Sequence, residues 1–259
     1  MRVGSLESVH RYPVKSMAGE SIDEVFVGFS GVMGDRVFAF TRIGGTEGFP
    51  WLTCRELEEM LLFKPSFDKE EQGPAPVHLK QSFDLAPGVN PVFPERNAFD
   101  LKVALPDGRA LAIESPELAE EVAKKSGEAV ELRFSERSLY DCRPISIFGN
   151  RSAEELGKQL DMNIDRRRFR ANFYVNWDND KPFFENELVG KTIQIGSRLR
   201  VAIVDRDPRC KVITLDPETT EATPRVLRHI TAEHEGFAGV YGAVLLEGVV
   251  KAGDPIHVV

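Results

Sequence analysis

One cysteine of the chain, Cys210, lies between two cationic residues at the end of a strand-like segment. The segment VDRDPRCKVITLDPET covers residues 204–219, and Arg209 and Lys211 flank the cysteine directly. A neighbouring positive charge favours the thiolate, which is both the nucleophilic and the metal-binding form of cysteine. Taken alone, Cys210 fits a packing role equally well, so its chemistry depends on what surrounds it.

Polar and cationic residues near the start of the chain suggest a second kind of chemistry, the binding of an anion. Lys15 and Ser16 end the segment YPVKS, and Arg36 follows a glycine turn in GVMGDR. Lysine and arginine donate charge-assisted hydrogen bonds to phosphate oxygens. As an isolated pair, Lys15 and Ser16 also fit an ordinary connection between a strand and a turn.

The basic run RRRFRAN, residues 166–172, stands out in an acidic chain. We interpret it as part of a strand over 167–177, in which alternation places Arg168, Arg170 and Asn172 on one face. Three polar side chains on a core face would each need a partner. The run alone also fits a solvated edge strand. Combined with Arg209 and Cys210, it predicts an anionic cofactor held beside a thiol.

The other cysteines and the histidines indicate less chemistry. Cys54 and Cys142 fit packing roles, and the three cysteines have no CxxC spacing. They support neither a disulfide framework nor a four-cysteine metal site. The five histidines are scattered, and we expect structural or surface roles for them. Hydrolase, P-loop, zinc-protease and dinucleotide-binding signatures are absent. No flavin, iron–sulfur or nicotinamide motif is present either, so any redox role needs electrons from another protein.

Short alternating segments separated by turns dominate the chain and predict β structure of the barrel type. The turn PDGR at 106–109 predicts a hairpin. We expect strands in the following segments: 2–14, 21–29, 35–43, 99–113, 129–135, 167–177, 190–206, 239–250 and 254–259.

Capping signals predict a few short helices, in which a serine or threonine begins each helix. The stretch 64–98 is rich in proline, glycine and charge and predicts a long surface excursion. The expected helical segments are 53–62 from Thr53, 115–127 from Ser115, 150–162 from Ser152 and 223–236 from Thr223.

Composition narrows the function classes. The chain has 259 residues and a net charge of −8, whereas nucleic-acid-binding surfaces are usually basic, so we expect no nucleic-acid partner. No apolar run reaches 18 residues and the first residues lack a signal-type segment, so we expect a soluble protein without a membrane partner. The sparse cysteines favour a reducing, cytoplasmic location.

Six motifs in order resemble the MOSC superfamily (molybdenum cofactor sulfurase C-terminal domain). The chain is most similar to two-part members with an N-terminal β-barrel region, such as the mitochondrial amidoxime-reducing component and its bacterial relatives. The motifs span nearly the whole chain: YPVKSMAGESIDEVFVGFSGVMGDRVFAF, WLTCRELEEMLLFKP, DCRPISIFGNRSAEELGKQL, RRFRANFYV, RDPRCKVITLDPET and GAVLLEGVVKAGDPIHV.

The resemblance implies that Cys210 ligates molybdenum, with further sulfurs supplied by the dithiolene of the pterin. In this chain Pro208 stands where the family often has a serine, and Cys54 stands where it has an alanine. The second change brings another thiol toward the site and leaves the ligand assignment open. The residues expected to hold the molybdopterin and its phosphate are Lys15, Ser16, Arg36, Arg55, Arg168, Arg170, Asn172 and Arg209.

The resemblance also implies the fold, the domains and the function. We expect a β-rich α+β protein with an N-terminal β-barrel region over 1–115 and a MOSC β-barrel domain over 116–259, which share one cleft. The implied activity is a molybdenum-dependent oxidoreductase that reduces N-hydroxylated compounds. Its electrons would come from a separate flavoprotein, ferredoxin or cytochrome b5 type protein. The alternative is a sulfur or molybdenum-cofactor carrier that uses a persulfide on Cys210.

Overall fold

The computed structural model describes residues 1–45, 48–67, 74–76, 79 and 94–259. Strands dominate these residues, in agreement with the alternating sequence segments. The strands are β1 (Arg2–Arg11), β2 (Glu20–Ile22), β3 (Glu24–Gly28), β4 (Gly31–Val32), β5 (Phe38–Arg42), β6 (Lys64–Phe67), β7 (Leu101–Ala104), β8 (Ala110–Ala112), β9 (Val130–Phe134), β10 (Ile145–Gly149), β11 (Phe173–Trp177), β12 (Thr192–Ile195), β13 (Leu199–Pro208), β14 (Phe237–Leu246), β15 (Gly248–Lys251) and β16 (Pro255–Val258).

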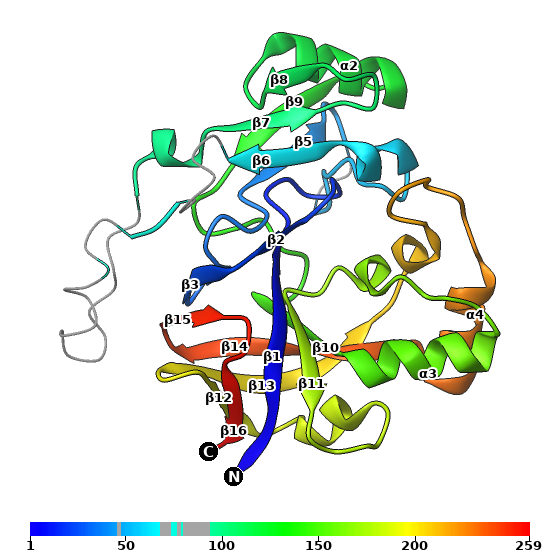
Figure 1. Cartoon of the computed structure of the whole chain (residues 1–259). Coiled ribbons are helices and arrows are strands. Elements are labelled where there is room, and N and C mark those ends of the chain that lie inside the picture. Colours follow the sequence, from blue (N-terminus) through cyan, green and yellow to red (C-terminus); the bar gives the residue numbers. More distant parts are fainter. Residues whose placement is uncertain (46–47, 68–73, 77–78, 80–93) are drawn as a thin grey trace.

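Seven strands form a closed ring in the order β1-β11-β10-β14-β13-β12-β16, because β1 pairs with both β11 and β16. All neighbours in the ring are antiparallel except β10 and β11, which are parallel. Closure leaves no unpaired edge inside the ring. The barrel forms the lower half of Figure 1, and both termini lie at its base.

Alternating apolar side chains fill the barrel. The inward positions of β13 are buried while its neighbours are exposed, as expected for a strand with one face in a core. Gly242 of β14 is a position of close packing, because a Cβ there would lie 2.4 Å from the Val201 side chain. Other fully buried side chains of the barrel include Leu6, Val9, Ile147, Phe173, Ile193 and Val240.

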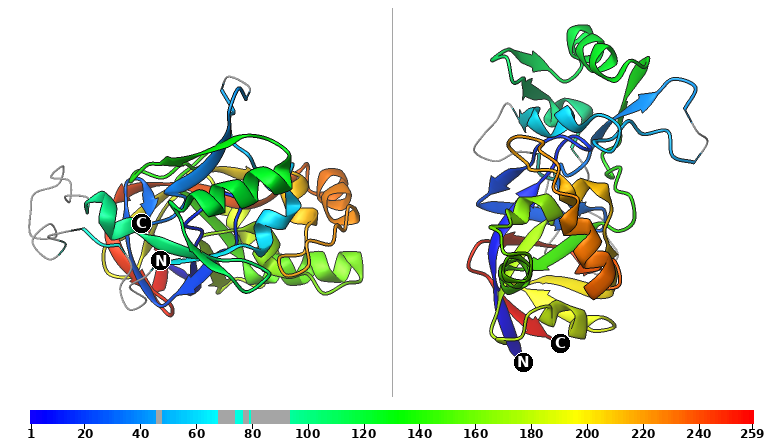
Figure 2. Two further views of the ribbon diagram at one scale, coloured as in Figure 1. Left: turned by 90° about the horizontal axis from the view of Figure 1, so that it is seen from above. Right: turned by 90° about the vertical axis from the view of Figure 1, so that its right-hand side faces the viewer.

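Three smaller sheets extend the structure away from the barrel. They are β15-β3-β4, β5-β9 and β6-β7-β8. The predicted hairpin is confirmed: Ala104 of β7 pairs with Ala110 of β8, and Gly108 takes a positive φ of 90° in the turn. In the right-hand view of Figure 2, the sheets β5-β9 and β6-β7-β8 and the helix that follows β8 lie at the end opposite the chain termini.

Among the described residues there are three α-helices, α2 (Pro116–Ser126), α3 (Asn150–Leu160) and α4 (Arg225–Glu233), and five short 3-10 helices. The 3-10 helices are η1 (Glu58–Leu62), η2 (Arg96–Phe99), η3 (Arg166–Phe169), η4 (Phe184–Leu188) and η5 (Lys211–Thr214). In α2 the predicted cap is confirmed, since Ser115 accepts the Glu117 N–H and Gly127 ends the helix at φ 73°.

The other helix predictions need correction. Helix α3 begins at Asn150, before Ser152, because the Ser152 hydroxyl is buried and donates to Glu185 instead of capping. Helix α4 follows Pro224 without a side-chain cap. Of the expected helix over 53–62, only η1 forms, although Thr53 and Glu56 make the predicted hydrogen bonds.

The β-rich α+β fold class is therefore confirmed. The ends of the expected excursion 64–98 form β6 and η2, and most of the stretch between them lies outside the described residues. The boundary at residue 115 stays a prediction. No helix within the described ranges is long and apolar enough to cross a membrane.

Candidate cofactor site

A cavity of about 370 Å³ opens where the N-terminal segments meet the barrel. Lys15 and Cys210, from opposite halves of the sequence, line the same cavity, as a shared site requires. The structure brings all of the sequence-predicted site residues to this cavity: Lys15, Ser16, Arg36, Arg55, Arg168, Arg170, Asn172, Arg209 and Cys210. Their roles toward a ligand stay predictions.

Cys210 lies in the short connection between β13 and η5, with extended backbone and an exposed side chain. The two cations beside it are occupied by other groups. Lys211 Nζ donates to the Arg55 carbonyl at 2.9 Å and pairs with Glu58 Oε1 at 2.7 Å. These contacts hold the start of η5 against the N-terminal segment. They therefore restrain the backbone next to the Cys210 thiol.

The Arg209 guanidinium also binds groups within the protein. Its Nε donates to the Ala238 carbonyl at 2.6 Å and its Nη1 to the Phe169 carbonyl at 2.8 Å. Its Nη2 lies 2.7 Å from Asp207 Oδ2, and both side chains are buried. Gly239 permits this packing, because a Cβ there would lie 3.1 Å from Arg209 Nη2 and 2.8 Å from the Ile147 carbonyl oxygen.

The basic run does not form the predicted strand. Residues Arg166–Phe169 form the 3-10 helix η3, Arg170 takes a left-handed backbone at φ 52°, and β11 starts only at Phe173. The Asp165 carboxylate causes the difference, because it accepts the Arg167 N–H at 2.9 Å and so begins a helical turn. Arg168 and Arg170 do line the same cavity, but they do so from a helical turn. The predicted reason, alternation of side chains along a strand, is therefore wrong.

Among the arginines that line this cavity, Arg168 and Arg170 each have a buried N–H group for which the structure shows neither a hydrogen bond nor an ion pair. Arg168 is buried and bonds to the Thr214 carbonyl at 2.7 Å and to Asp216 at 2.9 Å, but its Nε has no partner. Arg170 lies over the Tyr12 ring at 4.3 Å, and its buried Nη2 also has no partner. Burial lowers the pKa of Arg170 from its ordinary value. Unsatisfied buried cationic donors are costly, and an anionic ligand in the cavity would satisfy them.

The N-terminal cations are also placed by local backbone geometry. Lys15 is buried, pairs with Asp141 at 2.5 Å and donates to the Leu139 carbonyl at 2.9 Å; burial lowers its pKa despite that pair. Arg36 pairs with Asp35 and donates to the Arg170 carbonyl at 3.2 Å. Ser16 and Arg36 both have positive φ, at 69° and 49°, in the turns that carry them to the cavity.

Asn172 uses its amide to join strands. Its Oδ1 accepts the Ser146 N–H at 3.1 Å, and its Nδ2 donates to the His10 carbonyl at 3.3 Å. The side chain is therefore held between β1 and β10. Arg55 is the contrasting case, because it is exposed and bonds only weakly to Thr53, at 3.3 Å.

All three cysteines line this cavity. The expected packing role of Cys142 is wrong, because this residue is exposed. Cys54 is buried as expected, and burial raises the pKa of its thiol. Within the described residues, no group of three or more His, Cys, Asp or Glu side chains could hold a bare metal ion. A metal on Cys210 would thus need further ligands from a cofactor.

Sequence reasoning missed a polar network in the cavity wall. Asp207 is buried on β13 and accepts a hydrogen bond from the Ser146 hydroxyl of β10 at 2.9 Å. Tyr241 of β14 is the cross-strand partner of Ser146 and lines the same cavity as Asp207. Burial raises the pKa of Asp207. No motif signals this network, because it depends on the register of three neighbouring strands.

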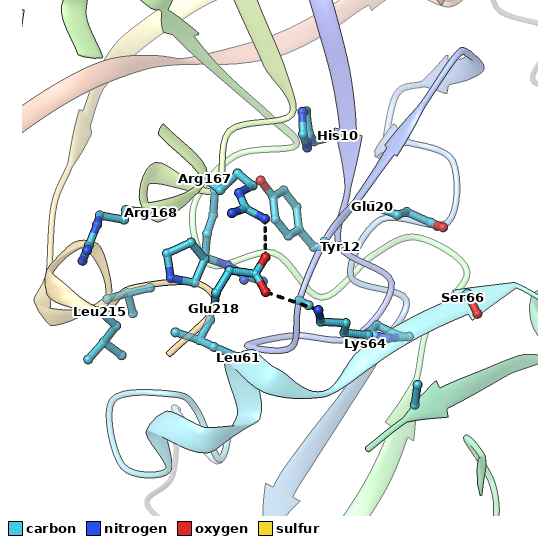
Figure 3. A pocket seen from close by; sticks show the side chains of 17 residues that line it. His10, Tyr12, Glu20, Leu61, Lys64, Ser66, Arg167, Arg168, Leu215 and Glu218 are labelled. Carbon is cyan, nitrogen blue, oxygen red and sulfur yellow. Dashed lines mark hydrogen bonds and ion pairs between the residues drawn. The ribbon is translucent and has the colours of Figure 1, made fainter. Parts of the chain in front are cut away.

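A second cavity, of about 360 Å³, is shown in Figure 3. Arg168 and Arg170 line both this cavity and the first one. Glu218 crosses this cavity and pairs with Lys64 at 3.3 Å and with Arg167 at 2.6 Å. Glu218, in the loop after η5, thereby joins β6 to η3. The shared arginines therefore form the wall between the two cavities.

The structure is thus a closed β-barrel with an adjoining cavity that is lined by cationic side chains and thiols. Two family models match the chain: the MOSC domain over residues 135–257 and the MOSC N-terminal beta barrel domain over residues 3–84. The chain belongs to the MOSC-domain proteins.

Solved structures of low similarity accompany this match. YiiM from Geobacillus stearothermophilus is 18% identical with a TM-score of 0.36, over 45% of this chain and 54% of that chain. The chain thus spans about half the length of that structure. The YUAD protein from Bacillus subtilis is 14% identical with a TM-score of 0.48, over 98% and 94%. Neither likeness supports a functional statement. The comparison with curated proteins gives no match.

Proposed function

We propose that this protein is a molybdenum-cofactor-binding oxidoreductase that reduces N-hydroxylated compounds. The observation that carries the proposal is the pairing of an exposed thiol with unsatisfied cationic donors in one cavity. Cys210 lines the same cavity as Arg168 and Arg170, each of which has a buried N–H without a partner. A thiolate suits a soft, sulfur-rich metal centre, and guanidinium groups suit a phosphate.

The residues of the cavity then have two kinds of role: some would bind the cofactor, and others position the cavity wall. Arg168 and Arg170 would bind the phosphate, Lys15 would add charge, and Cys210 would ligate the metal. Arg209 and Asn172 already use their side chains within the protein, so they position the cavity wall. When bound, the cofactor would supply the two-electron chemistry at the metal. With one cofactor in the chain, a separate flavoprotein, ferredoxin or cytochrome b5 type protein would deliver the electrons to it.

Metal analysis tests this proposal directly. Protein made in a host that synthesises the cofactor should contain molybdenum, and Cys210→Ser should lose turnover while its fold stays intact. A neutral hydroxyl is a far poorer ligand for a soft metal than a thiolate. Cys54→Ser is the comparison for the second thiol. Wild-type protein with near-zero molybdenum, or Cys210→Ser with full activity, would contradict the proposal.

One observation favours a second candidate, a sulfur or cofactor carrier. Three thiols line a single cavity, and two of them, Cys142 and Cys210, are exposed. A persulfide on Cys210 would be the carried group, and a reducing cytoplasm would keep the neighbouring thiols unpaired. Intact mass spectrometry separates the two candidates. A labile adduct of about 32 Da on Cys210 without molybdenum indicates the carrier, given the mass of one sulfur atom.

A further inference from the structure

Two histidines at the end of α4 converge on one oxygen atom of α3. His229 Nε2 lies 2.8 Å from Gln159 Oε1, and His234 Nε2 lies 3.0 Å from the same atom. The centres of the two imidazole rings are 5.7 Å apart. Because an amide oxygen only accepts hydrogen bonds, each ring donates to it through Nε2. Three side chains from two helices thus meet at one point.

The end of α4 brings the two histidines together. Residues five apart in a helix do not share a face, since the neighbours on one face are three or four residues apart. Helix α4 ends at Glu233, however, and His234 leaves the helical path with φ −128° and ψ 22°. The His234 ring packs against the Phe183 ring, with 4.3 Å between their centres. The pair therefore depends on the helix end, which the spacing in the sequence does not show.

The donor atoms suit a divalent transition-metal cation. Imidazole nitrogen is a common ligand of Zn²⁺, Cu²⁺ and Ni²⁺. If a cation took the present place of Gln159 Oε1, each histidine nitrogen would move by less than about 1 Å to reach the usual Zn–N distance of about 2.0–2.1 Å. Gln159 is exposed, so its side chain has room to rotate back and keep its oxygen as a third ligand. Water would complete a tetrahedral site.

The charges around the histidines also favour a cation. Glu155 accepts a hydrogen bond from Gln159 Nε2 at 3.3 Å, which directs the amide oxygen toward the histidines. The negative charges of Glu155 and Glu233 both act on His234. Burial, followed by the nearby His229, lowers the pKa of His234, so its ring is neutral at pH 7. A histidine that binds a metal must be neutral.

We propose that His229, His234 and Gln159 form a binding site for a divalent transition-metal cation, with Zn²⁺ as the expected ion, and that this cation joins α3 to α4. The site has two histidines and an amide, so it differs from the groups of three or more His, Cys, Asp or Glu that the described part of the chain lacks. It is independent of the proposed reductase function. The described residues that line the cofactor cavity do not include any of the three.

A cation at this site would stabilise the support beneath the Cys210 loop. Leu156 of α3, Ile230 of α4 and Ile213 of η5 belong to one buried cluster, and η5 begins directly after Cys210. Helices α3 and α4 lie together at one side of the barrel (Figure 1). A bond across the two helices therefore restrains the surface on which η5 packs.

Titration calorimetry with ZnCl2 tests the site on protein without cofactor or affinity tag. Every sample carries Cys142→Ser and Cys210→Ser, because exposed thiols also bind zinc. This parent should bind one Zn²⁺ per chain. His229→Ala should weaken binding at least about 100-fold, since loss of an outer partner of a ligand alone costs about 10- to 100-fold. His257→Ala, which removes a histidine from β16, is the matched control and should keep the affinity of the parent. A parent that binds no zinc, or equal affinity in the His229 variant and the parent, would overturn the proposal.

Three further measurements separate ligation from a defect in folding. Gln159→Glu should tighten zinc binding and Gln159→Leu should weaken it, because a carboxylate is a better third ligand than an amide and a methyl group is none. Cu²⁺ bound to the parent should show hyperfine coupling to two nitrogens in its electron paramagnetic resonance spectrum. Zinc should raise the temperature of thermal unfolding of the parent but not of His229→Ala. Copper without nitrogen coupling, or an equal rise with zinc in both proteins, would contradict the site.

Discussion

The Arg170 guanidinium lies 4.3 Å from the centre of the Tyr12 ring, and its buried Nη2 has no hydrogen-bond partner. Tyr12 follows the first strand, whereas Arg170 follows η3 in the second half of the chain. Arg36 lies over the same ring at 4.9 Å. The uncharged Tyr12 ring thus contacts both Arg36 and Arg170 of the candidate site and leaves their positive charges in place.

Arg170→Ala should therefore weaken anion binding without unfolding the protein. A charge-assisted hydrogen bond contributes about 1.5–3 kcal/mol, so we expect roughly a 10- to 100-fold loss in affinity for the cofactor. Molybdenum content per chain, measured by mass spectrometry at limiting cofactor supply, reports the change. Arg167→Ala is the matched control, because Arg167 belongs to the same run but pairs with Asp165 and Glu218. Equal losses in both variants would contradict the site.

The three thiols should differ in their reaction with an alkylating reagent. Cys54 is 1% exposed and burial raises its pKa, whereas Cys142 and Cys210 are exposed. Native protein without cofactor should take up iodoacetamide at Cys142 and Cys210 only, and urea should release Cys54. Peptide mass spectrometry checks the sites. Modification of Cys54 at the same rate as Cys142 and Cys210 would contradict the burial of the Cys54 thiol.

Acid should destabilise the protein through His10. Burial is the main cause that lowers the pKa of His10 to about 4 in the folded protein. The unfolded chain takes up this proton near pH 6.5, so stability falls as the pH drops from about 6.5 to 4. The full difference amounts to about 3 kcal/mol. Urea unfolding at several pH values should show a weaker pH dependence in His10→Gln, and identical pH dependence would refute the assignment.

Glu185 should be a stability residue of the barrel. Its buried carboxylate accepts hydrogen bonds from the Gly149 N–H, the Ser152 hydroxyl and the Trp177 ring N–H. Glu185→Ala leaves three buried donors without a partner and should cost about 3 kcal/mol or more. Thermal unfolding measures the loss.

The control for Glu185 is Glu187→Ala. Glu187 is about half exposed and pairs with Lys181 at the surface, so its removal should cost under about 1 kcal/mol. A comparable loss in the two variants would mean that the three donors of the Glu185 site find other partners.

The candidate site could be predicted from residue types, whereas its internal geometry could not. Cys210 and the arginines are marked by charge in an acidic chain and by the family motifs. The 3-10 turn at Arg166–Phe169 depends on one cap, Asp165, which local alternation hides. The Ser146–Asp207 hydrogen bond depends on how β10, β14 and β13 are arranged in the sheet, which no local pattern encodes.

The role of Cys142 also could not be predicted from the sequence. Cys142 looks like a packing residue in sequence, and a serine variant there would serve as an inert control. Because Cys142 lines the cavity, it is no longer a neutral position. The strand β10 begins only at Ile145, three residues after Cys142, and Cys142 itself is exposed.

The placement of β1 in the ring sets an order of events during synthesis. Gly4 pairs with Trp177 on one side and with Ile256 on the other, so the partners of the first half of this strand are translated long after it. Its last residues, Val9–Arg11, pair with β2, which follows directly in the sequence. Until those partners are made, the first half of the strand has two open edges, and such edges pair readily with other chains. The barrel can be sealed only when β16 arrives, which makes closure a late step dominated by contacts of high sequence separation. Slow release of the final strand would therefore lengthen the period in which chaperones protect the nascent chain.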